Sequence, residues 1–310
     1  MSISKGDSKR SLYVFLLVTQ CAIFGFSFVV VKKLLDYGCP TFLLMSIRFF
    51  IGTLSLIIVG LLFGKKIGGK GSPLSFRKKE MLYGTIAGIA LFLSFGLQTF
   101  GANYTTPAKN GLLTGVFVVF VPLLSMLLKR KFHIKPIALA VAAFVGAVIV
   151  SGITASDLSI NVGDMLSILC GFVFAVHFLL LEKYAPDPEI DTIRFTEVQL
   201  FVVAILSVIF SLGLENRNYT DFQWGNTIGW FLFIGIISTA VTYLIQTVVQ
   251  AKLSANTCSV ISCSESVFAV SISLVLGYEI FSIRLLIGAI FIVTSMVIAS
   301  IQKQDVLENK

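Results

Sequence analysis

Residues 41–63 read TFLLMSIRFFIGTLSLIIVGLLF, an unbroken apolar run in which Arg48 is the single charged residue. A helix of this length crosses the roughly 30 Å of bilayer hydrocarbon at about 1.5 Å per residue. Similar runs recur along the chain, at about 12–31, 41–63, 81–103, 107–128, 136–153, 163–182, 194–214, 226–250, 256–276 and 282–301. The sequence therefore predicts an all-α integral membrane protein with ten transmembrane helices.

The composition of the whole chain agrees with this prediction. Of its 310 residues, 56% are hydrophobic and 13% are charged, and the mean hydropathy is +0.93. Soluble domains are about 45–50% apolar and about 25% charged, so a chain of this composition does not hide its apolar surface in one water-soluble core. The expected surroundings are a lipid bilayer.

The net charge of +8 is spread over the short segments between the apolar runs. Because these basic residues gather on no soluble face, we expect no nucleic-acid partner. The five cysteines lie mostly inside apolar runs and show no Cys-x-x-Cys spacing, which favours small buried side chains over metal ligands. No cofactor and no metal site are expected.

The distribution of lysine and arginine predicts the orientation of the chain. Segments on the side of the N-terminus are rich in basic residues, for example Lys65, Lys66 and Lys70 in one loop, whereas the other side holds few. Such residues favour the cytoplasm, so residues 1–11 and 302–310 are expected to be cytoplasmic tails of a multi-pass protein of the cell membrane. A solvated inner loop is expected around Asp187, Glu189 and Asp191.

The chain also contains an internal duplication. Shifted by 148 positions, the third to fifth runs match the eighth to tenth, and a shift of 150 places the first run on the sixth. The matching pairs include Gln98/Gln246, Thr99/Thr247, Val119/Val267, Phe120/Phe268 and Ser125/Ser273. Residues 12–153 and 163–301 are therefore expected to be two five-helix repeats. An odd number of passes inverts the second repeat relative to the first, an arrangement that typically surrounds a central site.

Several short motifs occur in a recognisable order. In the first half they are Phe24-Gly25-Phe26-Ser27-Phe28, Arg48-Phe49-Phe50-Ile51-Gly52, Tyr104-Thr105-Thr106-Pro107-Ala108-Lys109 and Leu113-Thr114-Gly115, and in the second half Gly163-Asp164, Thr239-Ala240-Val241-Thr242-Tyr243, Leu253-Ser254-Ala255, Glu265-Ser266-Val267-Phe268 and Gly277-Tyr278-Glu279. In this order they resemble the EamA-like family of the drug/metabolite transporter (DMT) superfamily. The resemblance implies ten helices in two inverted five-helix repeats around a central cavity, and transport of small organic solutes.

Two charged residues inside the apolar runs are candidates for the substrate pathway. Glu265 lies near the middle of the ninth run, among small polar residues, where a carboxylate is able to carry a proton or to pair with a cationic group. The alternative is a structural carboxyl that is hydrogen-bonded between helices. Arg48 keeps its charge and needs a carboxylate, carbonyl groups or water nearby. It either contacts an anionic group of the substrate or forms a structural pair.

Four neutral polar residues complete the candidate pathway. Gln98 and Gln246 occupy equivalent positions in the two repeats, and Gln199 and His177 lie within the seventh and sixth runs. Glutamine amides are able to line a cavity, or to bond between helices without contacting substrate. A histidine in a transmembrane segment suits proton coupling, although a lone histidine is more often simply hydrogen-bonded.

Together these features predict a secondary transporter that moves small organic metabolites, such as amino acids or related solutes, by alternating access. Export is the expected direction, with protons as a candidate coupling ion. The alternative is a multi-span membrane enzyme that acts on lipid or lipid-linked substrates. Such enzymes usually place clusters of His, Asp or Glu near the membrane surface, and the loops of this chain show no such cluster with histidine or cysteine.

Overall fold

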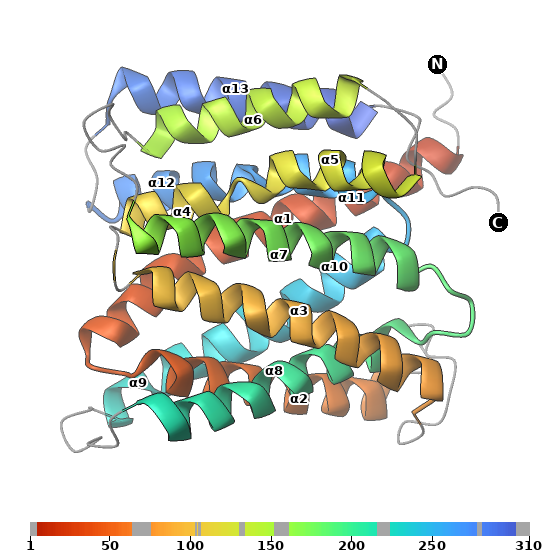
Figure 1. Ribbon diagram of the computed structural model, residues 1–310, viewed down its shortest axis with the longest axis vertical. Coiled ribbons are helices and arrows are strands. Elements are labelled where there is room, and N and C mark those ends of the chain that lie inside the picture. The colour runs from red at the N-terminus through yellow and green to blue at the C-terminus, as the bar shows by residue number, and fades with distance from the viewer. Residues whose placement is uncertain are drawn as a thin grey trace.

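The computed structural model describes residues 5–63, 76–102, 104, 107–129, 134–151, 161–215, 224–277 and 281–301. This part of the chain is helical and contains no strand (Figure 1). In chain order the helices are α1 (Lys5–Asp36), α2 (Thr41–Phe63), α3 (Lys78–Ala102), α4 (Pro107–Thr114), α5 (Phe117–Lys129), α6 (Ile134–Ser151), α7 (Val162–Tyr184), α8 (Thr192–Leu214), α9 (Trp224–Leu232), the π-helix η2 (Phe233–Val241), α10 (Thr242–Gln250), α11 (Ala255–Ser262), α12 (Ser264–Val275) and α13 (Ile283–Ile301). Of the expected tails, residues 1–4 and 302–310 lie outside the described residues, and α1 extends into segment 5–11.

Within the described residues, eight helical stretches are long and apolar enough to cross a membrane. Two of these stretches are built from consecutive helices: Asn110–Leu128 runs from α4 into α5, and Thr227–Gln250 runs from α9 through η2 into α10. One further pass, the fifth in chain order, is the shorter apolar helix Ile134–Val150. The remaining pass, the ninth in chain order, consists of α11 and α12, which follow one another across Cys263. The predicted ten-helix membrane architecture is confirmed.

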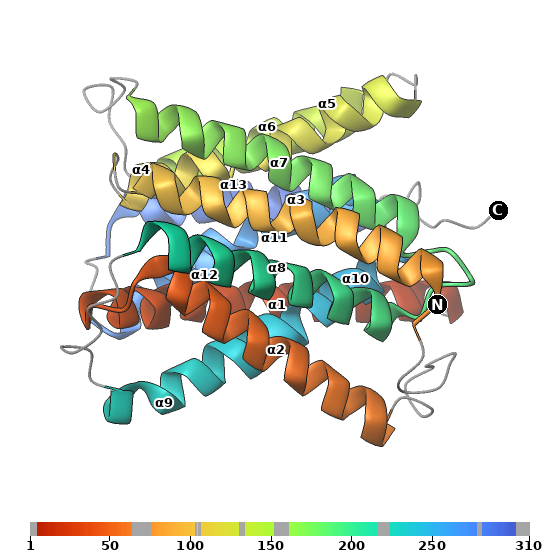
Figure 2. The same cartoon turned by 60° about the horizontal axis from the view of Figure 1, so that its bottom comes forward.

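The passes lie side by side in a bundle that is elongated across the helix direction (Figure 1). At one end of the bundle α6 packs against α13, and at the other end α2 packs against α8. Helices α1, α3 and α7 lie between these two pairs in the view of Figure 1, and Figure 2 shows the same bundle from below, with α2 and α9 at its lower edge. Each end pair joins equivalent passes of the two repeats, as expected for a duplicated chain.

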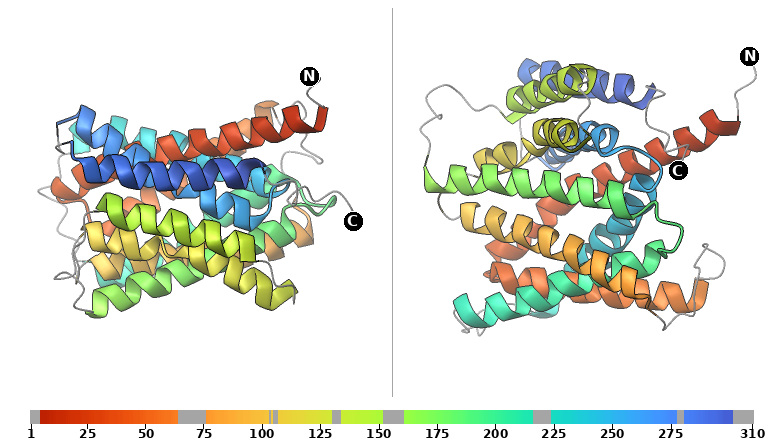
Figure 3. Two further views of the ribbon diagram at one scale, coloured as in Figure 1. Left: turned by 90° about the horizontal axis from the view of Figure 1, so that it is seen from above. Right: turned by 45° about the vertical axis from the view of Figure 1, so that its right-hand side comes forward.

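The two repeats run in opposite directions. Helix α1 begins on the right of Figure 1, whereas its equivalent α7 begins on the left. As a result α1 begins and α13 ends on the same side of the bundle (Figure 3). On this side, Arg10 Nε donates a hydrogen bond to the carbonyl oxygen of Ser300 at 2.7 Å. We call this side, where α1 begins and α13 ends, the terminal face, and the other side the opposite face.

Glycine residues allow the closest helix contacts in the bundle. A Cβ atom added to Gly146 of α6 would lie 2.8 Å from the carbonyl oxygen of Gly288 in α13, and one added to Gly288 would lie 2.6 Å from that of Gly146. A Cβ atom on Gly84 of α3 would lie 2.7 Å from the Cβ of Val198 in α8. Because small residues let backbones approach inside lipid, these positions fix the distances between neighbouring passes.

A carboxylate connects the two repeats at the opposite face. Glu215 directly follows α8, and its Oε1 accepts a hydrogen bond from the backbone N–H of Phe42 at 2.6 Å. Its Oε2 accepts from the backbone N–H of Leu43 at 3.0 Å and from the hydroxyl of Ser211 at 2.7 Å. The first N–H groups of a helix lack partners within that helix, and a negative charge is favourable there. Glu215 therefore stabilises the start of α2.

Candidate functional site

Two passes are interrupted at equivalent positions of the repeats. Helix α4 ends at Thr114 and α5 begins at Phe117, with Gly115 and Val116 between them. Helix α11 ends at Ser262 and α12 begins at Ser264, with Cys263 between them. Adding the repeat shift of 148 to position 115 gives 263. Discontinuous helices in corresponding positions of inverted repeats are the usual location of a transporter's binding site, so these two breaks define the region of the candidate site.

A central helix of each repeat packs closely against one of the breaks. In α1 the Sγ of Cys21 lies 3.7 Å from the carbonyl oxygen of Ile261. Its equivalent in α7, at position 21 + 150 = 171, is a glycine, and a Cβ added to Gly171 would lie 2.8 Å from the carbonyl oxygen of Thr114 and from Cγ1 of Val116. One helical turn further along α1, a Cβ on Gly25 would lie 2.8 Å from the backbone nitrogen of Ala269. Each break is thus packed against the first helix of the other repeat.

Glu265 lies in the first turn of α12, two residues after the break at Cys263. Its side chain is partly exposed, although the residue lies within a membrane pass. In the part of the chain that the structure describes, its carboxylate receives no hydrogen bond and forms no ion pair. The equivalent position in the first repeat, 148 residues earlier, is Phe117. The two breaks therefore present different chemistry, a carboxylate in one repeat and an aromatic ring in the other.

Arg48 of α2 forms its hydrogen bonds with the π-helix η2. Its Nε donates a hydrogen bond to Thr239 Oγ1 at 3.0 Å, and its Nη2 donates to the carbonyl oxygen of Ser238 at 3.4 Å. The guanidinium carbon lies 5.3 Å from the ring centre of Phe49 and 5.6 Å from that of Phe95. No carboxylate among the described residues pairs with Arg48. π-Helical turns inside α-helical passes are frequent at functional sites.

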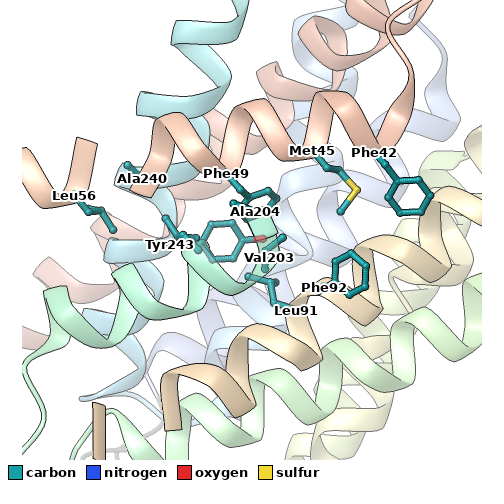
Figure 4. Packing of buried hydrophobic residues seen from close by; sticks show 11 residues of the cluster. Phe42, Met45, Phe49, Leu56, Leu91, Phe92, Val203, Ala204, Ala240 and Tyr243 are labelled. Carbon is teal, nitrogen blue, oxygen red and sulfur yellow. The ribbon is translucent and has the colours of Figure 1, made fainter. Parts of the chain in front are cut away.

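Aromatic side chains connect Arg48 with the helix breaks. Tyr243 lies beside Phe49 in the core between α2, α3 and α8, among Leu91 and Val203 (Figure 4). Tyr243 and Phe49 belong to a series of seven rings in which each ring centre lies 5.2 to 6.3 Å from the next. In order, the rings are Phe24 (α1), Tyr243 (α10), Phe49 (α2), Phe95 (α3), Phe174 (α7), Phe117 (α5) and Phe178 (α7). Arg48 and Tyr243 thus both lie against the ring of Phe49, whose centre is 5.3 Å from the guanidinium carbon and 6.0 Å from the Tyr243 ring centre.

His177 and Gln199 form a pair between α7 and α8. The Nε2 of His177 lies 3.1 Å from Oε1 of Gln199, and the amide nitrogen of Gln199 donates to the carbonyl oxygen of Phe195 at 3.4 Å. In this arrangement Oε1 is the acceptor, so the Nε2 atom of His177 carries the proton. The ring is fully buried, and its Nδ1 has no hydrogen-bond partner in the described structure.

The equivalent glutamines Gln246 and Gln98 belong to different hydrogen-bond networks. Gln246 accepts from the amide of Gln20 at 3.4 Å and donates to Gln250 at 3.3 Å, so it bonds α10 to α1. Gln98 donates to Thr114 Oγ1 at 3.4 Å, next to the break after α4. Both lie in the last turns of their helices, and inversion of the repeats puts those turns at opposite ends of the bundle. The structure does not bring these two residues together.

A buried charge cluster at the terminal face was not identified from the sequence. Arg194 and Glu197, one turn apart on α8, form an ion pair whose side chains are 7% and 2% exposed. The carboxylate of Glu80 accepts from the backbone N–H groups of Arg77 at 2.8 Å and Asp191 at 2.9 Å. The spacing of Arg194 and Glu197 is the one signal that indicates their pairing. It does not indicate burial.

The prediction of a solvated loop is wrong for Asp191. This residue is 7% exposed and its carboxylate accepts hydrogen bonds from the backbone N–H groups of Ile193 and Arg194, which makes it the N-cap of α8. Aspartate is a favoured N-cap because it satisfies N–H groups that lack helical partners. Its neighbours Asp187 and Glu189 do lie toward solvent, where both pair with Lys79 at 3.3 and 2.8 Å.

Both halves of the chain match the same known protein family. The family model described as "EamA-like transporter family" matches twice, at residues 11–152 and 161–301. An uncharacterized transporter of Archaeoglobus fulgidus is 29% identical over 96% of this chain and 88% of its own length. The uncharacterized transporters YoaV and YetK of Bacillus subtilis are 22% and 28% identical, over 89% and 93% of this chain and 92% and 87% of their own lengths.

A solved structure described as the crystal structure of a protein shares the fold, with a TM-score of 0.75 and 18% identity over 94% of this chain and 96% of that one. The family match covers both halves of the chain, and the relatives in Archaeoglobus and Bacillus are named as transporters. These names disfavour the alternative of a lipid-modifying enzyme. The chain belongs to the EamA-like transporter family and is a multi-pass membrane transporter of small molecules, not an enzyme.

Proposed function

We propose that the chain is a secondary carrier that exports small organic metabolites, such as amino acids or related solutes, across the cell membrane. The carrier would alternately expose one central site to the two sides. The observation that carries this proposal is the pair of helix breaks at Gly115 and Cys263, which lie in equivalent positions of two inverted repeats. A site at such breaks is flanked by two similar half-bundles, and rocking of one half against the other changes the side that is open.

Glu265 is the proposed coupling residue. A charge near the bilayer centre costs roughly 2.5–3.5 kcal/mol on insertion scales, and no described residue supplies a hydrogen bond or a cation to this carboxylate. Its side chain nevertheless retains exposure next to the break in the ninth pass. A carboxylate in this position gains stability by binding a proton or a cationic group of the solute. Competition between these two occupants would couple solute movement to protons.

The surroundings of Glu265 favour an organic solute over an inorganic ion. The chain of aromatic rings that begins at Phe24 and includes Tyr243 offers apolar and ring-stacking contacts, and several of its members remain partly exposed. Ligand sites for organic molecules typically combine aromatic walls with a few polar groups. A solute with an ammonium group and an apolar side chain matches the carboxylate and the rings.

Charge asymmetry supports a cytoplasmic terminal face. Among the described residues the basic residues of short segments concentrate there, and the cytoplasmic side of membrane proteins is the one enriched in lysine and arginine. By chain position, these residues at the terminal face are Lys5, Lys9, Arg10, Arg77, Lys78, Lys79, Lys129, Lys135, Lys183 and Lys252, and at the opposite face Lys32, Lys33, Lys109 and Arg284. With this orientation both chain ends lie in the cytoplasm.

Counterflow in proteoliposomes tests the proposed function. Purified protein is reconstituted, loaded with one unlabelled solute class at a time (amino acids, nucleosides, sugars or organic cations), and presented with the labelled solute outside. The proposal predicts transient accumulation of label for at least one amino-acid-like class and none in protein-free vesicles. Exchange of no class, together with chemical modification of the vesicle lipids, would contradict it and favour the enzyme.

A further inference from the structure

The guanidinium group of Arg48 is bound along one edge only. The Nε and Nη2 atoms, which share an edge, donate to Thr239 Oγ1 at 3.0 Å and to the carbonyl oxygen of Ser238 at 3.4 Å. Nη1 has no hydrogen-bond partner in the described part of the chain. The residue is not completely enclosed, because 6% of its surface remains exposed. A guanidinium offers five N–H donors in a rigid plane, so a second donor edge stays available.

The π-helix η2 fixes the direction of this available edge. The Thr239 hydroxyl donates to the carbonyl oxygen of Ile234 at 2.7 Å, which leaves its lone pairs directed at Nε of Arg48. The carbonyl of Ser238 also accepts from the Thr242 hydroxyl at 2.9 Å. A second hydrogen bond within the same pass therefore fixes the position of each acceptor. The guanidinium plane has little freedom to rotate.

Close packing of α2 on η2 makes this contact possible. A Cβ added to Gly235 of η2 would lie 2.5 Å from the Cβ of Ile51, and one added to Gly52 of α2 would lie 3.2 Å from the carbonyl oxygen of Gly235. The two glycines thus bring the backbone of η2 to the base of the Arg48 side chain. On the other side of the guanidinium lie the rings of Phe49 and Phe95, and both belong to the central series of rings.

The charge of Arg48 is not neutralised within the described structure. Its partners are a hydroxyl, a carbonyl and two aromatic faces, and no carboxylate forms an ion pair with it. A buried charge without an opposite charge is unfavourable, so an anion that reaches the available edge gains a large part of its binding energy there. A carboxylate matches the fork of an arginine edge with two parallel hydrogen bonds.

We propose that the available edge of Arg48 binds a carboxylate group of the transported solute, with Thr239 as the residue that positions it. This inference rests on the proposed function and adds a chemical requirement to it. Solutes that carry a carboxylate would be preferred over otherwise similar molecules that lack one. Thr239 itself contacts Arg48 and not the solute, so its effect on binding appears only for carboxylate-bearing solutes.

Three related probes separate a carboxylate site from general apolar binding: L-phenylalanine, 3-phenylpropionate, which lacks the amine, and phenethylamine, which lacks the carboxylate. Binding of each to the full chain in nanodiscs is measured by calorimetry for the parent, Arg48→Lys and Thr239→Val. The matched control is Thr53→Val, because Thr53 lies on the same helix as Arg48 and is also buried. Among the described residues its hydroxyl donates only to the carbonyl oxygen of Phe49 in that helix. Thermal unfolding of every variant is recorded in parallel.

The expected result is a loss of affinity of about tenfold or more for the two carboxylates in Arg48→Lys and Thr239→Val, as for loss of a hydrogen bond to a charged group. Phenethylamine should bind all variants as it binds the parent, and Thr53→Val should change nothing. Equal losses for all three probes in Thr239→Val, or unchanged carboxylate binding in Arg48→Lys, would overturn the inference.

Three further outcomes of the counterflow experiment separate this inference from the proposed function. If the parent exchanges only solutes without a carboxylate in the counterflow experiment, the carboxylate site is wrong while the transport function stands. If the parent binds none of the probes but exchanges other carboxylates, the variants are compared on those solutes by the same criteria. If it exchanges no solute at all, the proposed function fails, and the inference fails with it.

Discussion

At the scale of single residues, the charges inside the passes are of two kinds. Arg194 and Glu197 neutralise each other, with side chains almost fully buried. Arg48 and Glu265 have no charged partner among the described residues. An internal pair contributes to the folded structure, whereas an uncompensated charge in hydrocarbon remains costly until a mobile ion or solute binds. This difference separates residues that support the bundle from residues that interact with what it carries.

The ion pair predicts an asymmetric response to mutation. In Arg194→Met the carboxylate of Glu197 stays buried without its cation, and the free energy of unfolding should fall by about 3 kcal/mol. The double variant Arg194→Met/Glu197→Leu should recover most of this loss, because no uncompensated charge remains. Denaturant unfolding of the purified protein measures both. Equal destabilisation in the single and double variants would show that the charge pair is not what matters.

At the scale of helices, the number and positions of the passes followed from the sequence, because hydrocarbon thickness requires about 20 apolar residues per pass. The interruptions within them did not. Gly115 is conformationally permissive, but its equivalent Cys263 is an ordinary helical residue. At that break the backbone hydrogen bonds span three residues, from the N–H of Cys263 to the carbonyl of Val260 at 3.2 Å and from the N–H of Ser266 to the carbonyl of Cys263 at 3.3 Å. The sequence of η2, FIGIISTAV, carries no signal that distinguishes it from the α-helices around it.

The candidate site was predictable in its residues but not in their partners. Length and hydropathy identify Glu265 and Arg48, because charges are rare in apolar runs. The pairing of His177 with Gln199 depends on how α7 and α8 pack, and a single sequence does not contain that information. Gln98 and Gln246 are equivalent in sequence, yet inversion gives them different neighbours.

The approach of α1 to α12 gives a prediction at this scale. A Cβ at Gly25 would lie 2.8 Å from both the backbone nitrogen of Ala269 and the Cβ of Phe268. Gly25→Ala should therefore destabilise the protein by about 1–3 kcal/mol, as for an overpacked core. The control is Gly96→Ala, where an added Cβ meets no atom within 4 Å and alanine should stabilise the helix by about 0.5–1 kcal/mol. Thermal unfolding compares them, and similar behaviour of the two variants would contradict the tight crossing.

At the scale of the whole molecule, an even number of passes puts the start of α1 and the end of α13 on the terminal face, as the contact between Arg10 and Ser300 demonstrates. The excess of basic residues on this face favours the cytoplasm as its location. The same inversion places equivalent segments of the two repeats at opposite membrane surfaces. Alternating access through one central site requires this relation between the halves.

The orientation is testable with an impermeant maleimide on intact cells. Leu276→Cys, at the opposite face and 48% exposed, should be labelled from outside, and Lys252→Cys, exposed at the terminal face, only after lysis. The native cysteines should give little background, since all five are buried. Cys39 lies in the turn before α2. Its burial, and to a smaller extent the nearby charge of Glu215, raise its pKa to about 12, so the reactive thiolate is absent at pH 7. The reverse labelling pattern would invert the topology.

The central claim is that Glu265, beside the break in the ninth pass, couples solute movement to protons. The most direct measurement is solute uptake into proteoliposomes with and without an imposed proton gradient, for the parent, Glu265→Gln and the exposed-loop control Glu189→Gln. A gradient should accelerate transport by the parent and by Glu189→Gln, whereas Glu265→Gln should reconstitute normally and transport at the same rate with and without the gradient. Gradient-driven transport by Glu265→Gln at the rate of the parent would contradict the claim.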